Sequence, residues 1–135
     1  MTTLFPGVAE LVAEIASRGT ALYVVTNKPQ QPAEAILRHL ELDGLVRRVV
    51  GGDPAGHGTK PDRAARLVAD EGLSGGCFIG DGIDDLAAAE RIGARFFLAG
   101  WGYGTARVLA ERPDVVVLSQ PEDLLVALDR HVTTD

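Results

Sequence analysis

The chain has one cysteine, Cys77, and only 5% aromatic residues among its 135 residues. A single thiol excludes an internal disulfide. No apolar run approaches the roughly 20 residues that a membrane-spanning helix needs. The segment Met1–Pro6 also lacks a basic stretch followed by an apolar signal core. We therefore expect a cytoplasmic protein that does not cross a membrane.

Positive charge is also scarce. Thirteen Lys and Arg residues face nineteen Asp and Glu residues, so the net charge is −6. A chain of this charge is repelled by a polyanionic backbone, which argues against general nucleic-acid binding. A small phosphorylated ligand is still compatible with the sequence if positive groups gather at one site. With 46% hydrophobic residues, residues 1–135 suit a single domain with a real core.

Helical and strand-like patterns alternate along the whole chain. Strands are expected at Ala21–Val25, Arg48–Val50, Gly76–Gly80, Arg95–Ala99 and Val115–Leu118. Helices are expected from Pro6 to just before Gly19 and at Pro32–Leu40, Pro61–Glu71, Asp84–Ile92 and Glu122–Leu128. Strands joined through helices imply parallel pairing and a Rossmann-like three-layer α/β/α domain. Ligands of such domains bind at the carboxyl ends of the strands.

Polar residues follow the first of these strands and begin the third helix. The Thr26 hydroxyl, the Asn27 amide and nearby backbone amides can hydrogen-bond phosphate oxygens. On its own, Thr26-Asn27 can also cap or turn the chain before Pro29. Lys60, at the start of a helix, can place an ammonium group beside a phosphate and the helix N-terminal amides. An isolated lysine in this position can also be a solvated loop residue.

Three carboxylates, Asp81, Asp84 and Asp85, follow the strand that ends at Gly80. Negative charges this close repel one another, and a hard cation such as Mg²⁺ relieves that cost while bridging to phosphate. Asp84 or Asp85 is also well placed to cap the following helix, because the helix dipole favours acids in the first turn. The capping explanation does not extend to Asp81.

Together these segments resemble the haloacid dehalogenase superfamily, and most closely its phosphoglycolate phosphatase-like branch. The resemblance covers Phe5 to about Leu125. It rests on the order and spacing of Val24-Val25-Thr26-Asn27-Lys28-Pro29, Gly51-Gly52-Asp53, Lys60-Pro61-Asp62, Ile79-Gly80-Asp81 with Asp84-Asp85, and Trp101-Gly102-Tyr103-Gly104.

The resemblance implies a role for each polar residue. Thr26 would bind the transferring phosphoryl group, and Lys60 would offset charge on the nucleophile and the phosphate. Asp81 and Asp85 would hold Mg²⁺, since the family pattern places the second acid four residues after the first. Asp84 remains an alternative second ligand.

The chain departs from the family pattern at its most important point. Family members begin with a strand that ends in Asp-x-Asp, whose first carboxylate attacks phosphorus, and a helical cap follows. No Asp-x-Asp occurs in these 135 residues, and the cap is also missing. That first strand would lie between the strands at Ala21–Val25 and Gly76–Gly80. Without it, either these two strands pair directly or another polypeptide fills the position.

Two functions follow from this combination. The first is the core of a Mg²⁺-dependent phosphatase for a small phosphorylated metabolite, inactive or weak as an isolated chain. The second is a non-catalytic module that binds a phosphometabolite or a protein. Either way we expect a homodimer, or a partner chain that covers the gap in the sheet. Thr2–Phe5 is too short, and has no Asp, to restore the chemistry.

Overall fold

The computed structural model describes residues 7–53, 55–74 and 76–127, and within them it confirms the predicted alternation of helices and strands. The elements are α1 (Val8–Ser17), β1 (Tyr23–Pro29), α2 (Gln30–His39), β2 (Arg48–Gly52), α3 (Lys60–Glu71), β3 (Cys77–Gly80), α4 (Ile83–Ile92), β4 (Arg95–Ala99), α5 (Thr105–Glu111) and β5 (Val116–Leu118). Residues 123–127 are helical as well. Pro6, Leu128 and the segment Thr2–Phe5 lie outside the described residues.

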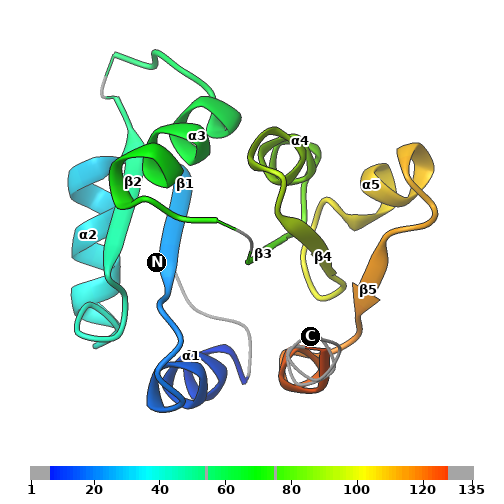
Figure 1. Cartoon of the computed structure of the whole chain (residues 1–135), viewed down its shortest axis with the longest axis horizontal. Coiled ribbons are helices and arrows are strands. Elements are labelled where there is room, and N and C mark those ends of the chain that lie inside the picture. Colours follow the sequence, from blue (N-terminus) through cyan, green and yellow to red (C-terminus); the bar gives the residue numbers. More distant parts are fainter. Residues whose placement is uncertain (1–6, 54, 75, 128–135) are drawn as a thin grey trace.

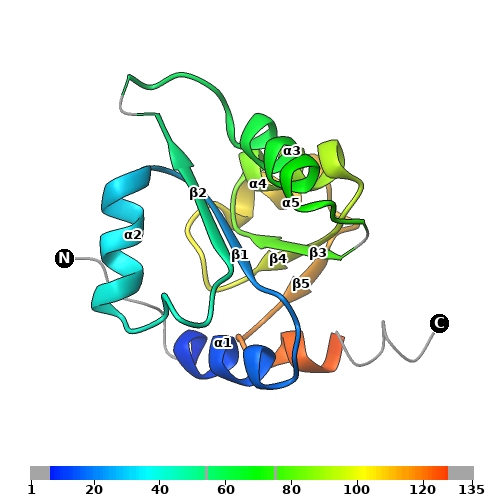
Figure 2. The ribbon, with the colours of Figure 1, turned by 60° about the vertical axis from the view of Figure 1, so that its left-hand side comes forward.

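The strands form two parallel sheets instead of one. β1 pairs with β2, and β3, β4 and β5 form a second sheet in that order. Figures 1 and 2 show β1 and β2 as one group of strands and β3, β4 and β5 as another. β1 and β3 are not hydrogen-bonded to each other, so the direct pairing considered from the sequence does not occur. The layer is therefore interrupted where the family resemblance indicates a missing strand.

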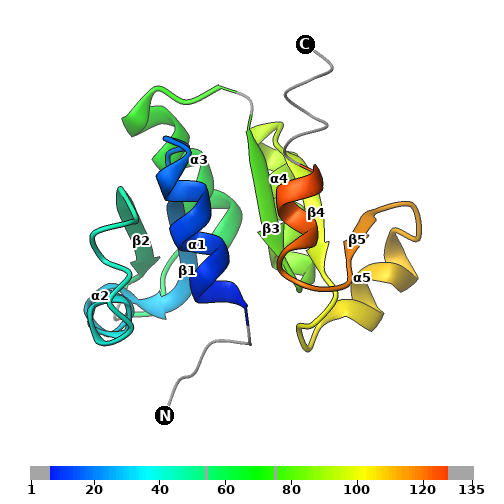
Figure 3. The same ribbon diagram turned by 90° about the horizontal axis from the view of Figure 1, so that it is seen from below.

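Helices on both faces connect the two sheets. α3 and α4 lie side by side over one face, and α1 and the helical residues 123–127 lie under the other (Figures 1 and 3). α2 packs beside β1 and β2, at the end of the layer away from β3. The three-layer α/β/α arrangement is thus confirmed. Packing between helices, above all between α3 and α4, holds the two sheets together where hydrogen bonds between neighbouring strands would normally do so.

The core lies on both faces of the second sheet. Phe97 of β4 packs with Leu11 and Ile15 of α1, whereas the next residue, Leu98, packs with Leu86 of α4. Successive side chains of a strand point to opposite faces, so β4 contributes to both layers. All five side chains are at least nine-tenths buried. As a result, α1 is fixed against the second sheet although it precedes β1 in the chain.

Local sequence explains where α3 begins and ends. The Thr59 hydroxyl accepts a hydrogen bond from the amide of Asp62 at 3.2 Å, which caps the helix, and Pro61 stands in the first turn. Gly72 ends the helix in the left-handed conformation at φ 63°, which glycine adopts without strain. These signals place Lys60 at the first helical position, one residue before the predicted start.

Besides shifts of one or two residues at element ends, as in α2, β2 and α3, the elements α5 and β1 differ from the sequence-based expectation. α5 was not predicted, because it is a seven-residue helix that directly follows the glycine-rich run Trp101–Gly104. β1 begins at Tyr23 and continues to Pro29, beyond the predicted end at Val25. Its register with β2 shifts between Val25 and Pro29, so the ladder is irregular there. Within residues 7–53, 55–74 and 76–127, no helix is long and apolar enough to span a membrane.

Candidate functional site

The irregular end of β1 presents Thr26 and Asn27 at the carboxyl edge of the first sheet. Thr26 is half-buried, and its hydroxyl oxygen accepts a hydrogen bond from the amide of Lys28 at 3.1 Å. This contact supports the turn-forming role considered for Thr26. The hydroxyl hydrogen has no acceptor among the described residues, so it remains free to donate to a phosphate oxygen.

Lys60 is drawn into the site by two carboxylates. Its side chain is only 13% exposed, and Nζ lies 2.8 Å from Oδ1 of Asp85 and 3.4 Å from Oδ2 of Asp84. The lysine comes from α3, whereas both acids stand in the first turn of α4. The ammonium group is therefore a fixed positive charge between the two helix N-termini.

Asp85 has a structural role in addition to its contact with Lys60. Its Oδ2 accepts hydrogen bonds from the amides of Asp81 and Gly82, at 3.1 and 3.2 Å, which caps α4. The side chain is 9% exposed. A Cβ added to Gly80 would lie 2.3 Å from Cγ of Asp85, so the strand can pass this carboxylate only with glycine. Asp85 is thus the helix-capping acid of the pair, which the sequence left open.

Asp84 carries the contact that crosses the interruption in the strand layer. Its Oδ2 accepts a hydrogen bond from Nδ2 of Asn27 at 2.7 Å, which joins the end of β1 to α4. Burial alone would raise the pKa of Asp84. The Lys60 ammonium and the Asn27 amide outweigh it, so the pKa lies below the usual value. Asp84 is therefore ionised at neutral pH.

Asp81 faces the loop after β4. Its Oδ2 accepts a hydrogen bond from the amide of Tyr103 at 2.9 Å. A Cβ on Gly102 would lie 2.2 Å from Cβ of Asp81, and one on Gly104 would lie 2.6 Å from the Asp81 carbonyl oxygen. The glycines therefore let the loop close against the carboxylate. The side chain of Tyr103 is 91% exposed beside it.

The carboxylates offer part of a magnesium coordination sphere. No group of three or more His, Cys, Asp or Glu side chains in the described part of the chain is arranged to hold a metal. Within that part, Oδ1 of Asp81 has no hydrogen-bond partner, whereas both oxygens of Asp85 accept hydrogen bonds. Mg²⁺ commonly takes one or two carboxylates and completes its shell with water and phosphate oxygens. Asp81 fits this role directly, and Asp85 fits it only while shared with Lys60.

Arg63 belongs to the same network, although the sequence did not single it out. Its Nη2 donates a hydrogen bond to Oδ1 of Asn27, and its Nε is buried with no partner in the described residues. The available signal was its spacing, since residues three apart on a helix lie on the same side, and Arg63 follows Lys60 by three. The network therefore runs from Arg63 through Asn27 and Asp84 to Lys60 and Asp85.

The chain's one thiol lies outside this network. Cys77 begins β3 and packs against the cluster around Phe97 and Leu11. Burial raises the pKa of the Cys77 thiol, and the nearby Arg95 guanidinium offsets this only in part. The thiol therefore stays protonated at neutral pH, which makes it a poor nucleophile.

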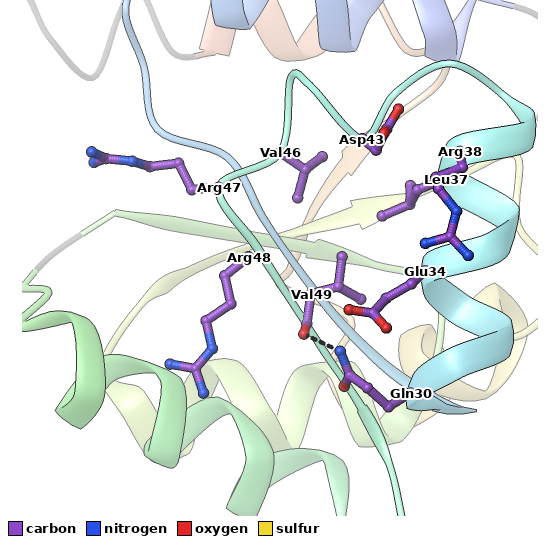
Figure 4. Close-up of a pocket in the computed structure, with 9 residues that line it drawn as sticks. All are labelled: Gln30, Glu34, Leu37, Arg38, Asp43, Val46, Arg47, Arg48 and Val49. Carbon is purple, nitrogen blue, oxygen red and sulfur yellow. Dashed lines mark hydrogen bonds between the residues drawn. The ribbon is translucent and has the colours of Figure 1, made fainter.

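An open pocket of about 410 Å³ lies elsewhere, between α2 and β2 (Figure 4). The Nε2 amide of Gln30 donates a hydrogen bond to the carbonyl of Val49 at 2.8 Å along one side of it. Arg38 and Arg47 supply exposed positive charge, and Glu34 and Asp43 supply negative charge. Because none of the predicted site residues lines it, this pocket has no part in the proposed chemistry.

Comparisons with known proteins agree with the fold and with the family resemblance. Residues 1–93 match the model of a family described as "Hydrolase: haloacid dehalogenase-like hydrolase". "Phosphoglycolate phosphatase 1" of Pseudomonas aeruginosa is 30% identical over 134 residues, which are 96% of this chain and 49% of that protein. "Phosphoglycolate phosphatase" of Aquifex aeolicus is 32% identical over 135 residues, which are 97% of this chain and 62% of that protein.

Solved structures show the same partial coverage. A haloacid dehalogenase-like family protein from Streptococcus pneumoniae superposes with a TM-score of 0.82 at 26% identity. The match covers 93% of this chain and 60% of the other. The chain thus spans about half to three-fifths of the length of the relatives it matches.

Proposed function

Because the chain belongs to the haloacid dehalogenase-like hydrolase family, we propose that it forms the larger part of the core of a Mg²⁺-dependent phosphatase for a small phosphorylated metabolite. One observation carries this proposal. Residues from β1, α3 and the first turn of α4 meet at one edge of the strand layer, where Lys60 contacts Asp84 and Asp85 and Asn27 contacts Asp84. Ligands of parallel α/β folds bind at this edge.

The roles follow from the chemistry of the groups. Thr26 and Asn27 would donate hydrogen bonds to phosphoryl oxygens. Lys60, held at 13% exposure, would balance the charge of the phosphate. Asp81 would bind Mg²⁺ through its unengaged oxygen, and Asp85 would assist while it orients Lys60. The metal would draw negative charge from the phosphoryl oxygens.

The attacking group must come from polypeptide outside these 135 residues, since they contain no Asp-x-Asp. We place it between β1 and β3, whose facing edges do not pair with each other. A parallel strand inserted there would satisfy both edges and end close to Lys60. A partner chain of different sequence could supply both the strand and the nucleophile, whereas a second copy of this chain could supply a strand alone, because it too contains no Asp-x-Asp. Positioning and charge balance alone do not replace a nucleophile.

The substrate class is inferred from the relatives. Two of them carry the name phosphoglycolate phosphatase, so we propose a small phosphomonoester of that kind as the ligand. The cytoplasmic location expected from the sequence remains part of this proposal.

A second candidate is a non-catalytic binding module. It is favoured by the way Lys60, Asp84, Asp85 and Asn27 satisfy one another through their hydrogen bonds and ion pairs. In that case the unpaired edges of β1 and β3 would serve as a protein-binding surface.

A phosphate-release assay, with calorimetric titration of the same compounds to measure binding, tests the two candidates. The purified chain and its Asp81→Asn variant are incubated with Mg²⁺ and either p-nitrophenyl phosphate or phosphoglycolate, and light scattering gives the oligomeric state. We expect binding of phosphoglycolate with little or no turnover by the isolated chain. Mg²⁺-dependent turnover that Asp81→Asn abolishes would rule out the binding-module alternative. Failure to bind either compound would refute the phosphatase proposal.

A further inference from the structure

Arg63 is the one positively charged side chain of the network to which the proposed phosphoryl-binding site gives no role. It stands in the first turns of α3, three residues after Lys60 and on the same side of the helix. Its Nη2 donates a hydrogen bond to Oδ1 of Asn27. The guanidinium group therefore lies next to the residue that follows Thr26.

The guanidinium of Arg63 has more donors than the surrounding protein uses. An arginine side chain offers five N–H donors, and in the described part of the chain the side chain of Arg63 has Asn27 as its only hydrogen-bond partner. Neighbouring arginines behave differently, since Arg66 contacts Asp70 and Arg91 contacts Asp62. Arg63 contacts no carboxylate in the same described residues.

Its Nε is also buried without a partner, although Arg63 as a whole is only half-buried. A buried donor that lacks a partner is unfavourable, and most such groups in folded proteins are satisfied by protein, water or ligand. Among the described residues Nη1 also has no hydrogen-bond partner but is not buried, so an anionic ligand can approach the guanidinium there.

The adjoining loop places a residue without a side chain, Gly58, beside the guanidinium. Gly58 adopts φ +84°, and a Cβ placed there would lie 3.7 Å from Nη1 of Arg63. Glycine tolerates this backbone conformation and contributes no side chain to cover the guanidinium. A planar guanidinium with open donors suits the two oxygens of a carboxylate or a phosphate.

We propose that Arg63 is a specificity-determining residue that binds a second anionic group, a carboxylate or a second phosphate, of the ligand held by Thr26 and Lys60. The proposal rests on the proposed function, because it takes the phosphoryl position as given. Asn27 links the phosphoryl position to the proposed second anion position, because it follows Thr26 in sequence and its side chain accepts a hydrogen bond from Arg63. The favoured ligands are therefore small phosphomonoesters with a negative charge at the other end.

Calorimetric titration in the presence of Mg²⁺ tests this directly. The probes are phosphoglycolate, 2-hydroxyethyl phosphate, which replaces the carboxylate with a neutral group, and ethylene glycol bisphosphate, which replaces it with a second phosphate. The wild-type chain should prefer the doubly anionic probes. Whichever of these binds more tightly identifies the second group as carboxylate or phosphate.

Variants then locate the source of the preference. Arg63→Gln should weaken binding of the preferred anionic probe about ten- to a hundredfold, the usual worth of a hydrogen bond to a charged group, and leave 2-hydroxyethyl phosphate unchanged. Arg63→Lys keeps a positive charge and should retain part of the preference for the doubly anionic probes. It also shows whether a loss of binding in Arg63→Gln comes from unfolding. Arg66→Gln removes an exposed arginine from the same helix. It should change neither the affinity for the preferred anionic probe nor the affinity for 2-hydroxyethyl phosphate.

Asn27→Ala separates direct binding from an indirect effect. If Arg63 contacts the ligand, Asn27→Ala lowers the affinity for all probes in parallel and preserves their ratio. The proposal is overturned if Arg63→Gln weakens every probe equally, since Arg63 would then only hold Asn27 in place. It is also overturned if the wild-type chain binds all three probes equally, a result that leaves the proposed function intact. If the wild-type chain binds none of them, both proposals fail.

Discussion

The contact between Lys60 and Asp85 should contribute far more to stability than an ordinary surface ion pair. The two side chains are 13% and 9% exposed, and their N and O atoms lie 2.8 Å apart. At an effective dielectric constant of about 20, two unit charges at that distance attract by about 6 kcal/mol, before desolvation is subtracted. Lys60→Met removes this attraction and leaves the Asp85 charge buried.

The net cost of Lys60→Met can be bounded from the remaining contacts. Removing one member of a buried pair typically costs about 3–5 kcal/mol. Asp85 keeps its two amide hydrogen bonds, so we place the loss near the lower end, at about 3 kcal/mol. Arg91→Met is the matched control. It also removes one positive charge that links α3 to α4, but its pair with Asp62 is 53% and 56% exposed, so the cost should stay below about 1 kcal/mol.

Urea denaturation at pH 7, followed by circular dichroism, measures both free energies of unfolding. The double variant Lys60→Met/Asp85→Asn should be more stable than Lys60→Met alone, because it no longer buries an unpaired charge. The reasoning is refuted if Lys60→Met costs no more than Arg91→Met, or if Asp85→Asn fails to relieve it. Either result would mean that water screens the pair despite its burial.

Two further predictions concern the same end of the molecule. Gly80→Ala should destabilise the fold and weaken phosphate binding, because the added Cβ would displace the carboxylate of Asp85. Gly44→Ala is the control, since a Cβ at Gly44 meets no atom within 4 Å. Equal thermal stabilities of the two variants would contradict this prediction. Hydrogen bonding with Thr59, and secondarily Arg91, lowers the pKa of Asp62. The ionised Asp62 should therefore stabilise the fold at pH values above its pKa in the unfolded chain, about 4. This stabilisation should disappear as the pH falls through the lower pKa that Asp62 has in the folded chain. Asp62→Asn should then cost stability at pH 7 but not near pH 2, and a pH-independent difference would contradict this.

The pattern of the sequence predicts most of the fold, because the helices and strands here have strong periodicity or clear end signals. Thr59 and Pro61 mark the start of α3, and Gly93 ends α4 at φ 68°. α5 escaped prediction because Val108 is its only buried residue, which leaves too little periodic pattern beside a glycine-rich loop. The interruption of the strand layer was foreseen only through the family resemblance.

The composition of the candidate site could be predicted, but its internal contacts could not. The rule that strand ends share one edge brings Asn27, Lys60 and Asp84 together. Which oxygen contacts which donor depends on side chains far apart in sequence, such as Asn27 with Asp84, and no local pattern encodes it. The same holds for Arg63, whose reach to Asn27 depends on the packing of α3 against β1.

The central claim is that phosphoryl groups bind where β1, α3 and α4 meet, and titration of the ¹⁵N-labelled chain with phosphate and Mg²⁺ tests it most directly. Amide signals of Thr26, Asn27, Lys60 and Asp81 should shift together and saturate with one affinity, and Asp81→Asn should suppress the Mg²⁺ dependence. Shifts confined to the pocket around Arg47, with none at these four residues, would contradict the claim.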